Sequence, residues 1–258
     1  MPISRFCEFA RSCGADSVEI LDAFWYEPGV IRDYIPDTST FESELESALD
    51  GIKVGAVAVT NDFVHSEPER IAVERAKIEL GLSVANRFGA GVVRVFSAHP
   101  SADDADSSRD RAIANLGSIN SADRTLALEN HGVVFGTPAE VLAISKGAGT
   151  GICFDIGNWL LAGVDPVKAA LEMPFPDLIH VKDFVSSIDG PFQSPDGGRL
   201  SGAFLGQGCV PIVETLRALF QRSDRRAVPI HLELECGDRG VEATREGIAW
   251  LRSTLSQL

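Results

Sequence analysis

Short apolar runs alternate with amphipathic segments along the whole chain, and this pattern is typical of an alternating α/β protein. Seven of the runs are rich in β-branched residues and predict strands at 16–21, 53–59, 91–97, 125–130, 151–156, 178–182 and 228–235. Most of them are continuously apolar, as in Val92-Val93-Arg94-Val95-Phe96. Such runs indicate strands that are buried on both faces of a parallel sheet.

The segments between the predicted strands carry helix signals with defined ends. Ser66-Glu67-Pro68-Glu69 fits a capping box, and Val73, Ala76, Leu80, Val84 and Phe88 then predict one apolar face that ends at Gly89. Thr137-Pro138-Ala139-Glu140 repeats the pattern with proline at the first helical position, and Asp165-Pro166 opens a further helix. The pattern therefore consists of repeated βα units.

The βα series has no break in composition, which favours a single domain over residues 1–258. Its length suits a (β/α)8 TIM barrel. The structural alternative is an open doubly wound sheet, but no Gly-x-Gly-x-x-Gly follows the first strand. Two long stretches, 97–109 and 185–204, are predicted to be irregular loops. The second, which contains prolines and paired glycines, is a candidate lid or subunit contact.

The charge balance limits the classes of partner. The 258 residues include 23 Lys and Arg against 37 Asp and Glu, a formal net charge of −14, and no basic run points to nucleic acid. No apolar window approaches the ~18 residues of a membrane span. Five cysteines with no Cys-x-x-Cys indicate free thiols in a reducing compartment. We expect a cytoplasmic protein that acts on a small molecule, without nucleic acid or membrane, and homo-oligomerisation is left open.

Nearly every predicted strand ends on a polar side chain, and in a TIM barrel these ends converge on one volume. Glu129, Asp155 and His180 follow one another at intervals of 26 and 25 residues, about one βα unit each, and Glu233 ends the last strand. Three carboxylates with one imidazole suit Mn²⁺, Mg²⁺, Co²⁺ or Fe²⁺ better than a structural zinc. The alternative is an acid cluster that Lys182 and Arg94 neutralise.

Several segments resemble one family of TIM barrels. They are Thr125-Leu-Ala-Leu-Glu129-Asn-His131-Gly, Gly151-Ile-Cys-Phe-Asp155-Ile-Gly-Asn158, Ile179-His180-Val-Lys182-Asp183, Leu205-Gly-Gln207-Gly and the segment 87–96. In this order, and over nearly the whole chain, they are similar to the xylose isomerase-like TIM barrels, the sugar phosphate isomerases and epimerases that share a fold with endonuclease IV. The resemblance implies the fold and the superfamily rather than the substrate.

The resemblance also implies roles for individual residues. It assigns one divalent metal ion (Mn, Mg, Co, Fe or Zn) to Glu129, Asp155, His180 and Glu233, with Glu235 as the alternative to the last ligand. It makes Glu129 and Glu233 a catalytic pair that moves a proton through a metal-bound enediolate. The expected activity is that of a sugar, sugar phosphate or inosose isomerase or epimerase. A dehydratase on the same site and a non-catalytic sugar-binding barrel are the alternatives.

The substrate-binding prediction covers residues on the same strand ends and loops. Lys182 is expected either to bind substrate or to pair with Asp183 or Glu129. Asn158 stands where related epimerases have histidine, so a substrate contact is altered. Gln207 replaces a glutamate that is common in the family. Five scattered histidines and the acidic charge argue against abasic-site nuclease activity. The full predicted set is Glu19, His65, Arg94, His131, Asn158, Lys182 and Asp183.

The start of the chain departs from the family pattern, because it opens on an amphipathic helix rather than on a strand. Ile3, Phe6, Phe9, Ala10 and Cys13 form its predicted apolar face, and Gly14 ends it. The count from Glu19 onward then gives seven strands. Either the recorded start is too late, or the barrel is truly seven-stranded and open. We predict an incomplete barrel in which strand 228–235 is unpaired on one side, or is covered there by a loop or a second subunit.

Overall fold

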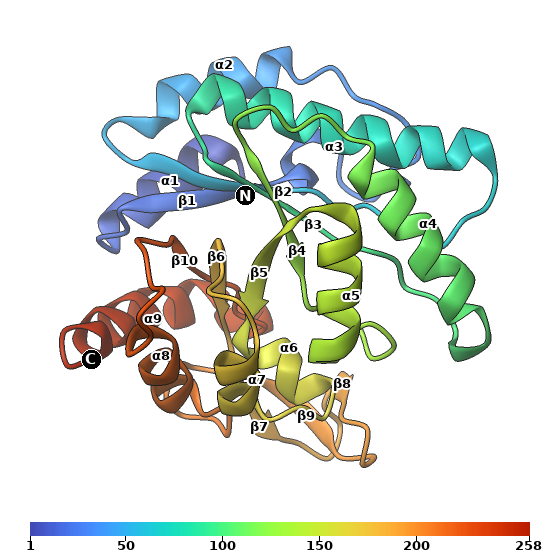
Figure 1. Ribbon diagram of the computed structural model, residues 1–258. Helices are drawn as coiled ribbons and strands as arrows, with labels where there is room; N and C mark the ends of the chain where they lie inside the picture. Colours follow the sequence, from blue (N-terminus) through green and yellow to red (C-terminus); the bar gives the residue numbers. More distant parts are fainter. The chain divides into compact units, whose positions relative to one another are not determined.

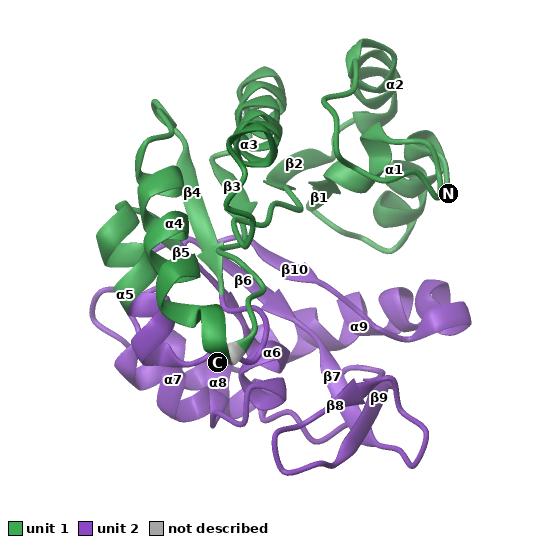
Figure 2. Ribbon diagram, turned by 90° about the vertical axis from the view of Figure 1, so that its right-hand side faces the viewer, with its two compact units in different colours: residues 1–129, 143–151 green, residues 130–142, 152–258 purple. Residues whose placement is uncertain are grey.

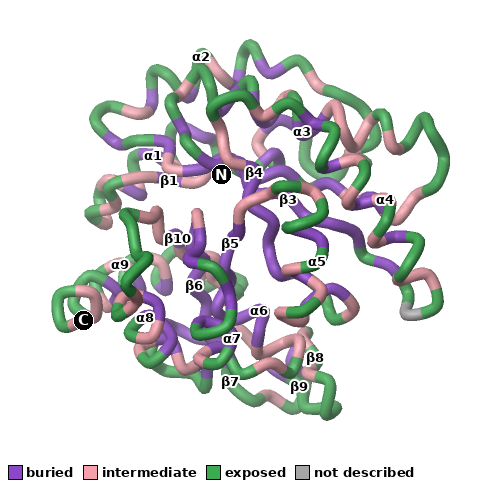
Figure 3. Tube along the Cα trace, viewed as in Figure 1, coloured by how far each residue is buried: buried purple, intermediate pink, exposed green. Residues whose placement is uncertain are grey.

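The computed structural model describes residues 1–258 except for the side chain of Ala102, and the chain forms two compact units (Figure 2). Unit 1 comprises residues 1–129 and 143–151, and unit 2 comprises residues 130–142 and 152–258. Strand β3 (Val92–Val95) in unit 1 and strand β6 (Leu178–Val181) in unit 2 are buried at every residue (Figure 3). The expectation of a single domain over residues 1–258 stays a prediction.

Unit 1 alternates helices and strands in chain order (Figure 1). Its strands pair in parallel, β1 with β2, β2 with β3 and β3 with β4, and a bulge between Val18 and Glu19 shifts the first pairing. Its elements are α1 (Ile3–Ser12), β1 (Ser17–Leu21), η1 (Asp22–Trp25), α2 (Ser39–Leu49), β2 (Lys53–Ala58), α3 (Pro68–Phe88), β3 (Val92–Val95), η2 (Ala102–Asp104), α4 (Ala105–Gly117) and β4 (Thr125–Glu129).

Helix α3 corrects two predictions. The capping box does not form, because Pro68 takes the first helical position and Glu67 becomes the N-cap residue without a side-chain cap. The buried face also differs from the predicted one and includes Ile78, Gly81 and Leu82. A Cβ added at Gly81 would press against Val59, so the glycine is what lets the helix approach β2 so closely. The predicted stop at Gly89 is confirmed by its positive φ of 73°.

Helix α1 and the two other predicted helix starts give a mixed result. In α1 the buried residues are Ile3, Cys7 and Ala10, so part of its predicted apolar face is wrong. The helix predicted to open at Asp165-Pro166 is present, and the carboxylate of Asp165 caps it by accepting hydrogen bonds from the N–H groups of residues 167 and 168. At α5, Thr137 Oγ1 accepts a hydrogen bond of 3.4 Å from the N–H of residue 140.

Unit 2 contains the remaining parallel strands. Strand β6 lies between β5 and β10 and pairs in parallel with both. Helix α5 (Pro138–Ala148) begins in unit 2 and ends in unit 1. The elements that follow are β5 (Gly151–Asp155), α6 (Ile156–Leu161), α7 (Pro166–Glu172), β6 (Leu178–Val181), β7 (Asp183–Ser186), β8 (Phe192–Gln193), β9 (Arg199–Ala203), α8 (Ile212–Phe220), β10 (Ile230–Leu232), η3 (Gly237–Arg239) and α9 (Gly240–Leu255).

The segment predicted as an irregular loop at 185–204 contains a small antiparallel sheet of order β7-β9-β8. The prediction of irregularity is therefore wrong for this segment. The ring of Phe184 is fully buried and meets Phe192 at a centroid distance of 5.2 Å, which gives the small sheet an apolar centre. The other predicted loop, 97–109, is shorter than expected, because α4 begins at Ala105.

The strand count agrees with the sequence. The parallel strands form one sheet of seven in the order β1-β2-β3-β4-β5-β6-β10, so all seven predicted strands are present. No eighth parallel strand occurs among the described residues, and β1 and β10 are the two ends of the order. The prediction of a seven-stranded barrel whose last strand lacks one neighbour is therefore confirmed.

Two further features bear on the expectations from composition. Among the described residues, no disulfide joins Cys7, Cys13, Cys153, Cys209 or Cys236. In the described part of the chain, no helix combines the length and the apolarity that crossing a membrane requires.

Candidate metal centre

Three of the four predicted metal ligands come together in unit 2. Asp155 ends β5, His180 lies in β6, and Glu233 follows β10 directly. Asp155 and His180 are partners in the β5–β6 pairing, and the N–H of Glu233 donates to the carbonyl of Val181 at 3.1 Å. Their ligand atoms lie within 4.8 Å of one another. Parallel pairing thus brings the three side chains to the same end of the strands.

The separations between these side chains suit a shared cation better than direct hydrogen bonds. Nδ1 of His180 lies 3.9 Å from Oδ2 of Asp155 and 3.6 Å from Oε2 of Glu233. These distances exceed hydrogen-bond range. Ligand atoms ~2.1 Å from one ion are about 3.0 to 4.2 Å apart in octahedral geometry. Two carboxylate oxygens with one imidazole nitrogen also match the donors of catalytic divalent ions. The residues therefore fit a divalent metal.

Asp155 is held in place from several sides. Asn130 accepts a hydrogen bond from the N–H of Asp155 at 2.8 Å and donates one to its carbonyl at 2.9 Å. Oδ1 of Asp155 accepts from the N–H of Asn158 at 2.8 Å, which caps α6. Its side chain has no exposed surface. Its Oδ2 faces His180 and Lys182.

Lys182 lies among the predicted ligands. Its Nζ is 3.0 Å from Oδ2 of Asp155 and 2.6 Å from Oε2 of Glu233, while its side chain is only 4% exposed. The sequence suggested Asp183 or Glu129 as its ionic partner, and the structure shows Asp155 and Glu233 in that role. Glu235, the alternative ligand at the end of the last strand, is exposed. The structure therefore groups Glu233 with the cluster.

Asp183 has a different role in unit 2. One oxygen accepts from the N–H groups of Gly206 and Gly208, and the other accepts from those of Phe184 and Val210. Four backbone donors thus use both of its oxygens. This predicted substrate ligand anchors the loop that contains the exposed Gln207.

The other predicted contacts of unit 2 lie beside Asp155. Asn158 is buried, and its Nδ2 lies 3.5 Å from Nδ1 of His131. His231, which the sequence analysis did not select, is the register partner of His180, and the two ring centroids are 6.4 Å apart. Asn130 is the second residue that the sequence analysis missed. Its place directly after Glu129, at a predicted strand end, was the only signal that the sequence offered for it.

Glu129, the fourth predicted ligand, belongs to unit 1 and ends β4. Its Oε2 forms a buried ion pair of 3.0 Å with Nε of Arg94. The guanidinium of Arg94 also donates to the carbonyl of Val59 at 3.2 Å and lies 4.2 Å from the ring centroid of Phe96. The predicted substrate contact Arg94 is therefore placed beside the predicted base Glu129.

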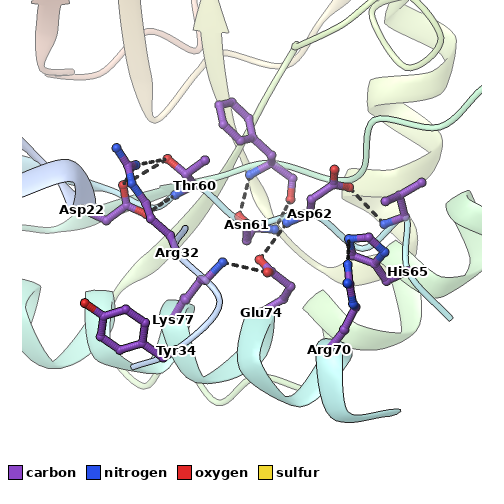
Figure 4. A network of polar contacts seen from close by, with 12 residues as sticks. Asp22, Arg32, Tyr34, Thr60, Asn61, Asp62, His65, Arg70, Glu74 and Lys77 are labelled. Atoms are coloured by element: carbon purple, nitrogen blue, oxygen red, sulfur yellow. Dashed lines mark hydrogen bonds and ion pairs between the residues drawn. The ribbon is translucent and has the colours of Figure 1, made fainter. Parts of the chain in front are cut away.

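The other strand ends of unit 1 form a network of polar contacts (Figure 4). Asp22, which follows β1, accepts hydrogen bonds from Arg32 and from the N–H and hydroxyl of Thr60. Asn61 holds the backbone of Phe96 through two hydrogen bonds of 2.7 and 2.9 Å. These hydrogen bonds join residues that follow β1, β2 and β3, and they include Arg32 from the segment between η1 and α2. Of the predicted contacts, Glu19 is a half-buried residue of β1 and His65 lies 3.3 Å from a guanidinium nitrogen of Arg70.

Asp62 shows how completely this network satisfies a carboxylate. Burial raises the pKa of Asp62, but its hydrogen bond and charge interaction with His99, together with the N–H groups of Val64 and His99, lower the pKa below its usual range. The imidazole Nδ1 of His99 lies 3.2 Å from Oδ2 of Asp62. Asp62 is thus stabilised as an anion by neighbours within unit 1.

The fold and the carboxylate–imidazole cluster define a TIM-barrel protein with a candidate divalent metal centre. The sequence profile of the Xylose isomerase-like TIM barrel family matches residues 7–254, and the chain belongs to this family. The resemblance seen in the sequence motifs is thereby confirmed. No curated protein matches the chain in sequence.

Solved structures with the same fold include proteins of several activities. A xylose isomerase-like TIM barrel protein from Mycobacterium smegmatis in complex with magnesium is 16% identical, with a TM-score of 0.71 over 98% of this chain and 88% of that one. A probable 3-DHS dehydratase, AsbF from Bacillus anthracis, is 18% identical, with a TM-score of 0.71 over 98% and 94%. An L-ribulose 3-epimerase is 15% identical, with a TM-score of 0.70 over 99% and 89%. At these identities the likeness concerns the fold.

Proposed function

We propose that this protein is a divalent-metal-dependent isomerase or epimerase of a small polyhydroxylated ketose, inosose or related hydroxy-carbonyl compound. The observation that supports the proposal is the convergence of Asp155, His180 and Glu233 within 4.8 Å in unit 2. The fold that the chain shares with an L-ribulose 3-epimerase agrees with it. Substrate, partner and cytoplasmic location all remain predictions, with a small molecule as the partner.

The proposed metal ligands are Asp155, His180 and Glu233, with Glu129 as the fourth, as the family resemblance implies. When bound, the metal would supply Lewis-acid stabilisation of negative charge on the substrate oxygens. Asn130 and the N–H of Asn158 orient Asp155 for this role. The metal could be Mn²⁺, Mg²⁺, Co²⁺, Fe²⁺ or Zn²⁺.

The chain's own carboxylates would then move the proton. We assign Glu129 and Glu233 as the acid–base pair, one of which takes a proton from carbon while the other returns one. Glu233 is one-third exposed and can reach a substrate, whereas Asp155 is fully buried. Lys182 places its ammonium beside the carboxylates of Asp155 and Glu233. Glu19, His65, Arg94, His131 and Asn158 remain proposed substrate contacts.

Two other functions are compatible with the same cluster. A lyase would begin with the same proton abstraction and would then expel water from a neighbouring β-hydroxyl. The similarity in fold to a probable 3-DHS dehydratase supports this second candidate. A sugar-binding barrel without catalysis is the third, and it predicts that protein purified without chelator contains no stoichiometric divalent metal.

The direct test is exchange of carbon-bound hydrogen in deuterated water. The purified protein with Mn²⁺ is incubated with a panel of ketoses, inososes and dehydroshikimate-like acids, and exchange is followed by NMR. Epimerisation gives a deuterated epimer, and a dehydratase gives a product that has lost water. Metal content is measured on the same preparation. The proposal is contradicted if the purified protein contains no divalent metal and, with Mn²⁺ added, exchanges hydrogen in none of the compounds.

Matched variants connect the activity to the site. Glu129→Gln and Glu233→Gln each remove one base and should lower exchange by ~10²–10⁴-fold without unfolding the protein. The double variant should be little worse than either single one, because the pair acts as a unit. Glu235→Gln is the matched control, since Glu235 is exposed two residues further along the same segment. Equal exchange by wild type and both single variants refutes the assignment.

A further inference from the structure

Packing within unit 2 fixes the position of the Lys182 side chain. Its stem passes over Gly157, where an added Cβ would collide with Cγ of Lys182 and crowd the ring of Phe184. Gly157 is itself buried in the first turn of α6, and its φ is not positive. The glycine is therefore required by the space that the lysine stem occupies rather than by its own backbone conformation. The segment Asp155-Ile156-Gly157-Asn158 supplies both a proposed ligand and the groove for the lysine.

The head of Lys182 meets two proposed ligands at once. Nζ lies 3.0 Å from Asp155 and 2.6 Å from Glu233, through the same two oxygens that face His180. The side chains of Asp155 and Lys182 are almost completely buried. Two carboxylates this close repel each other strongly when water is excluded. One ammonium between them offsets most of that repulsion.

We infer that Lys182 is a resident counter-charge of the metal centre: it holds Asp155 and Glu233 together without metal, and it weakens the binding of a divalent cation. The inference rests on the proposed function in taking these two residues as metal ligands. Its two effects have one cause, because the positive charge that attracts the carboxylates also repels a second cation beside them. Lys182 is thus a positioning residue that makes the bound metal exchangeable.

A counter-charge differs from an ordinary structural ion pair in what its removal does to metal binding. Removal of one partner from a buried pair leaves the other charge uncompensated and destabilises a protein. A structural pair predicts only that loss. A counter-charge predicts in addition that divalent metal binds more tightly after the lysine is neutralised, and that the metal restores the lost stability.

The experiment measures Mn²⁺ affinity and thermal stability on the same proteins. Lys182→Met removes the charge and keeps most of the stem, whereas Lys182→Gln keeps a hydrogen-bond donor and guards against a folding failure of the methionine variant. Lys168→Met is the matched control, because Lys168 is an exposed lysine of α7 in the same unit. Free Mn²⁺ is counted by electron paramagnetic resonance, and unfolding is followed in chelator and in excess Mn²⁺.

We expect Lys182→Met and Lys182→Gln to bind Mn²⁺ at least about tenfold more tightly than wild type. In chelator both should melt below wild type, and Mn²⁺ should raise their melting temperature more than it raises that of wild type. Lys168→Met should match wild type in both measurements. Equal or weaker Mn²⁺ binding by both Lys182 variants overturns the inference while the metal site itself stands. If neither wild type nor any variant binds Mn²⁺, the proposed function and the inference both fail.

Discussion

Carboxylates lie at the strand ends of both units, but they have different roles in the two. In unit 1, Asp22 and Asp62 are satisfied by a guanidinium, a hydroxyl, an imidazole and backbone N–H groups of their own unit. In unit 2, Asp155 and Glu233 converge on His180 at distances too long for hydrogen bonds, with one ammonium between them. A polar strand end is therefore not by itself a functional site. What distinguishes the candidate centre is convergence of acids on one point.

The two buried asparagines make the comparison closer. Asn61 follows β2 and holds both backbone groups of Phe96, and Asn130 follows β4 and holds both backbone groups of Asp155. The amide replaces a pair of strand-to-strand hydrogen bonds in each case. The hydrogen-bond arrangement is the same, but in unit 1 it holds an apolar residue and in unit 2 it holds a proposed ligand. We therefore expect removal of either asparagine to lower the free energy of unfolding by a similar amount. Only removal of Asn130 should also weaken metal binding.

The largest expected difference concerns the two buried aspartates. Asp155→Asn should weaken Mn²⁺ binding by more than the ~10–100-fold that changes around a metal's ligands produce, because it removes a proposed ligand charge. Asp22→Asn should leave Mn²⁺ affinity within about threefold of wild type and instead lower stability through the lost Arg32 pair, whose two atoms are 3.0 Å apart. Isothermal titration with Mn²⁺ and thermal unfolding measure the two effects. Similar Mn²⁺ affinities for both variants would abolish the distinction between the units.

Asp183 tests whether every acid of unit 2 belongs to the centre. Asp183→Ala leaves four backbone N–H groups without their acceptor and should cost about 2 kcal/mol or more of unfolding free energy. Urea denaturation measures that loss. Mn²⁺ affinity of the folded variant should stay within about threefold of wild type, since the carboxylate oxygens are already used. A hundredfold loss of affinity would show that Asp183 serves the centre directly.

These contrasts also show what the sequence could predict. The seven parallel strands followed from apolar runs, because a strand buried on both faces must be continuously apolar. Asp155, His180 and Glu233 followed from their places at the ends of such strands. Their convergence needs only the parallel topology, which brings equivalent strand ends together.

Other features depend on contacts that local pattern does not encode. Asn130 acts on a residue 25 positions away, and its own neighbourhood gives no sign of that partner. Lys182 could equally have paired with the adjacent Asp183, and the difference was decided by the four N–H groups that already occupy Asp183. The β7-β9-β8 sheet was missed because its strands are two to five residues long between proline and glycine signals.

The asparagine pair gives a smaller, matched prediction. Asn61→Ala and Asn130→Ala each remove two hydrogen bonds to buried backbone groups and should each cost about 1–3 kcal/mol of unfolding free energy. Only Asn130→Ala should also weaken Mn²⁺ binding, by roughly tenfold, because the ligand Asp155 loses its orientation. Chemical denaturation and Mn²⁺ titration of both variants give the comparison. An equal loss of Mn²⁺ affinity in Asn61→Ala would place the effect in general destabilisation.

The smallest expected effect is the pH dependence of the Asp62–His99 pair. The pKa of Asp62 is lowered in the folded protein, so its anion contributes stability above its unfolded pKa of about 3.9, and that contribution is lost as pH falls through the folded pKa. His99→Ala removes the hydrogen bond and the charge interaction of the ring, so the pKa of Asp62 should rise toward its ordinary value. Carbon-13 NMR titration of the Asp62 carboxyl measures this directly.

A second variant separates the two contributions of the ring. His99→Gln retains a donor without charge, so the pKa of Asp62 should fall between the values of wild type and His99→Ala. The N–H groups of Val64 and His99 still donate to Asp62 in both variants, so only part of the shift should disappear. Mn²⁺ affinity at neutral pH should be the same in all three proteins, because Asp62 is an anion in each. If either variant changes that affinity, a unit 1 strand end acts on the metal centre, which contradicts the contrast between the two units.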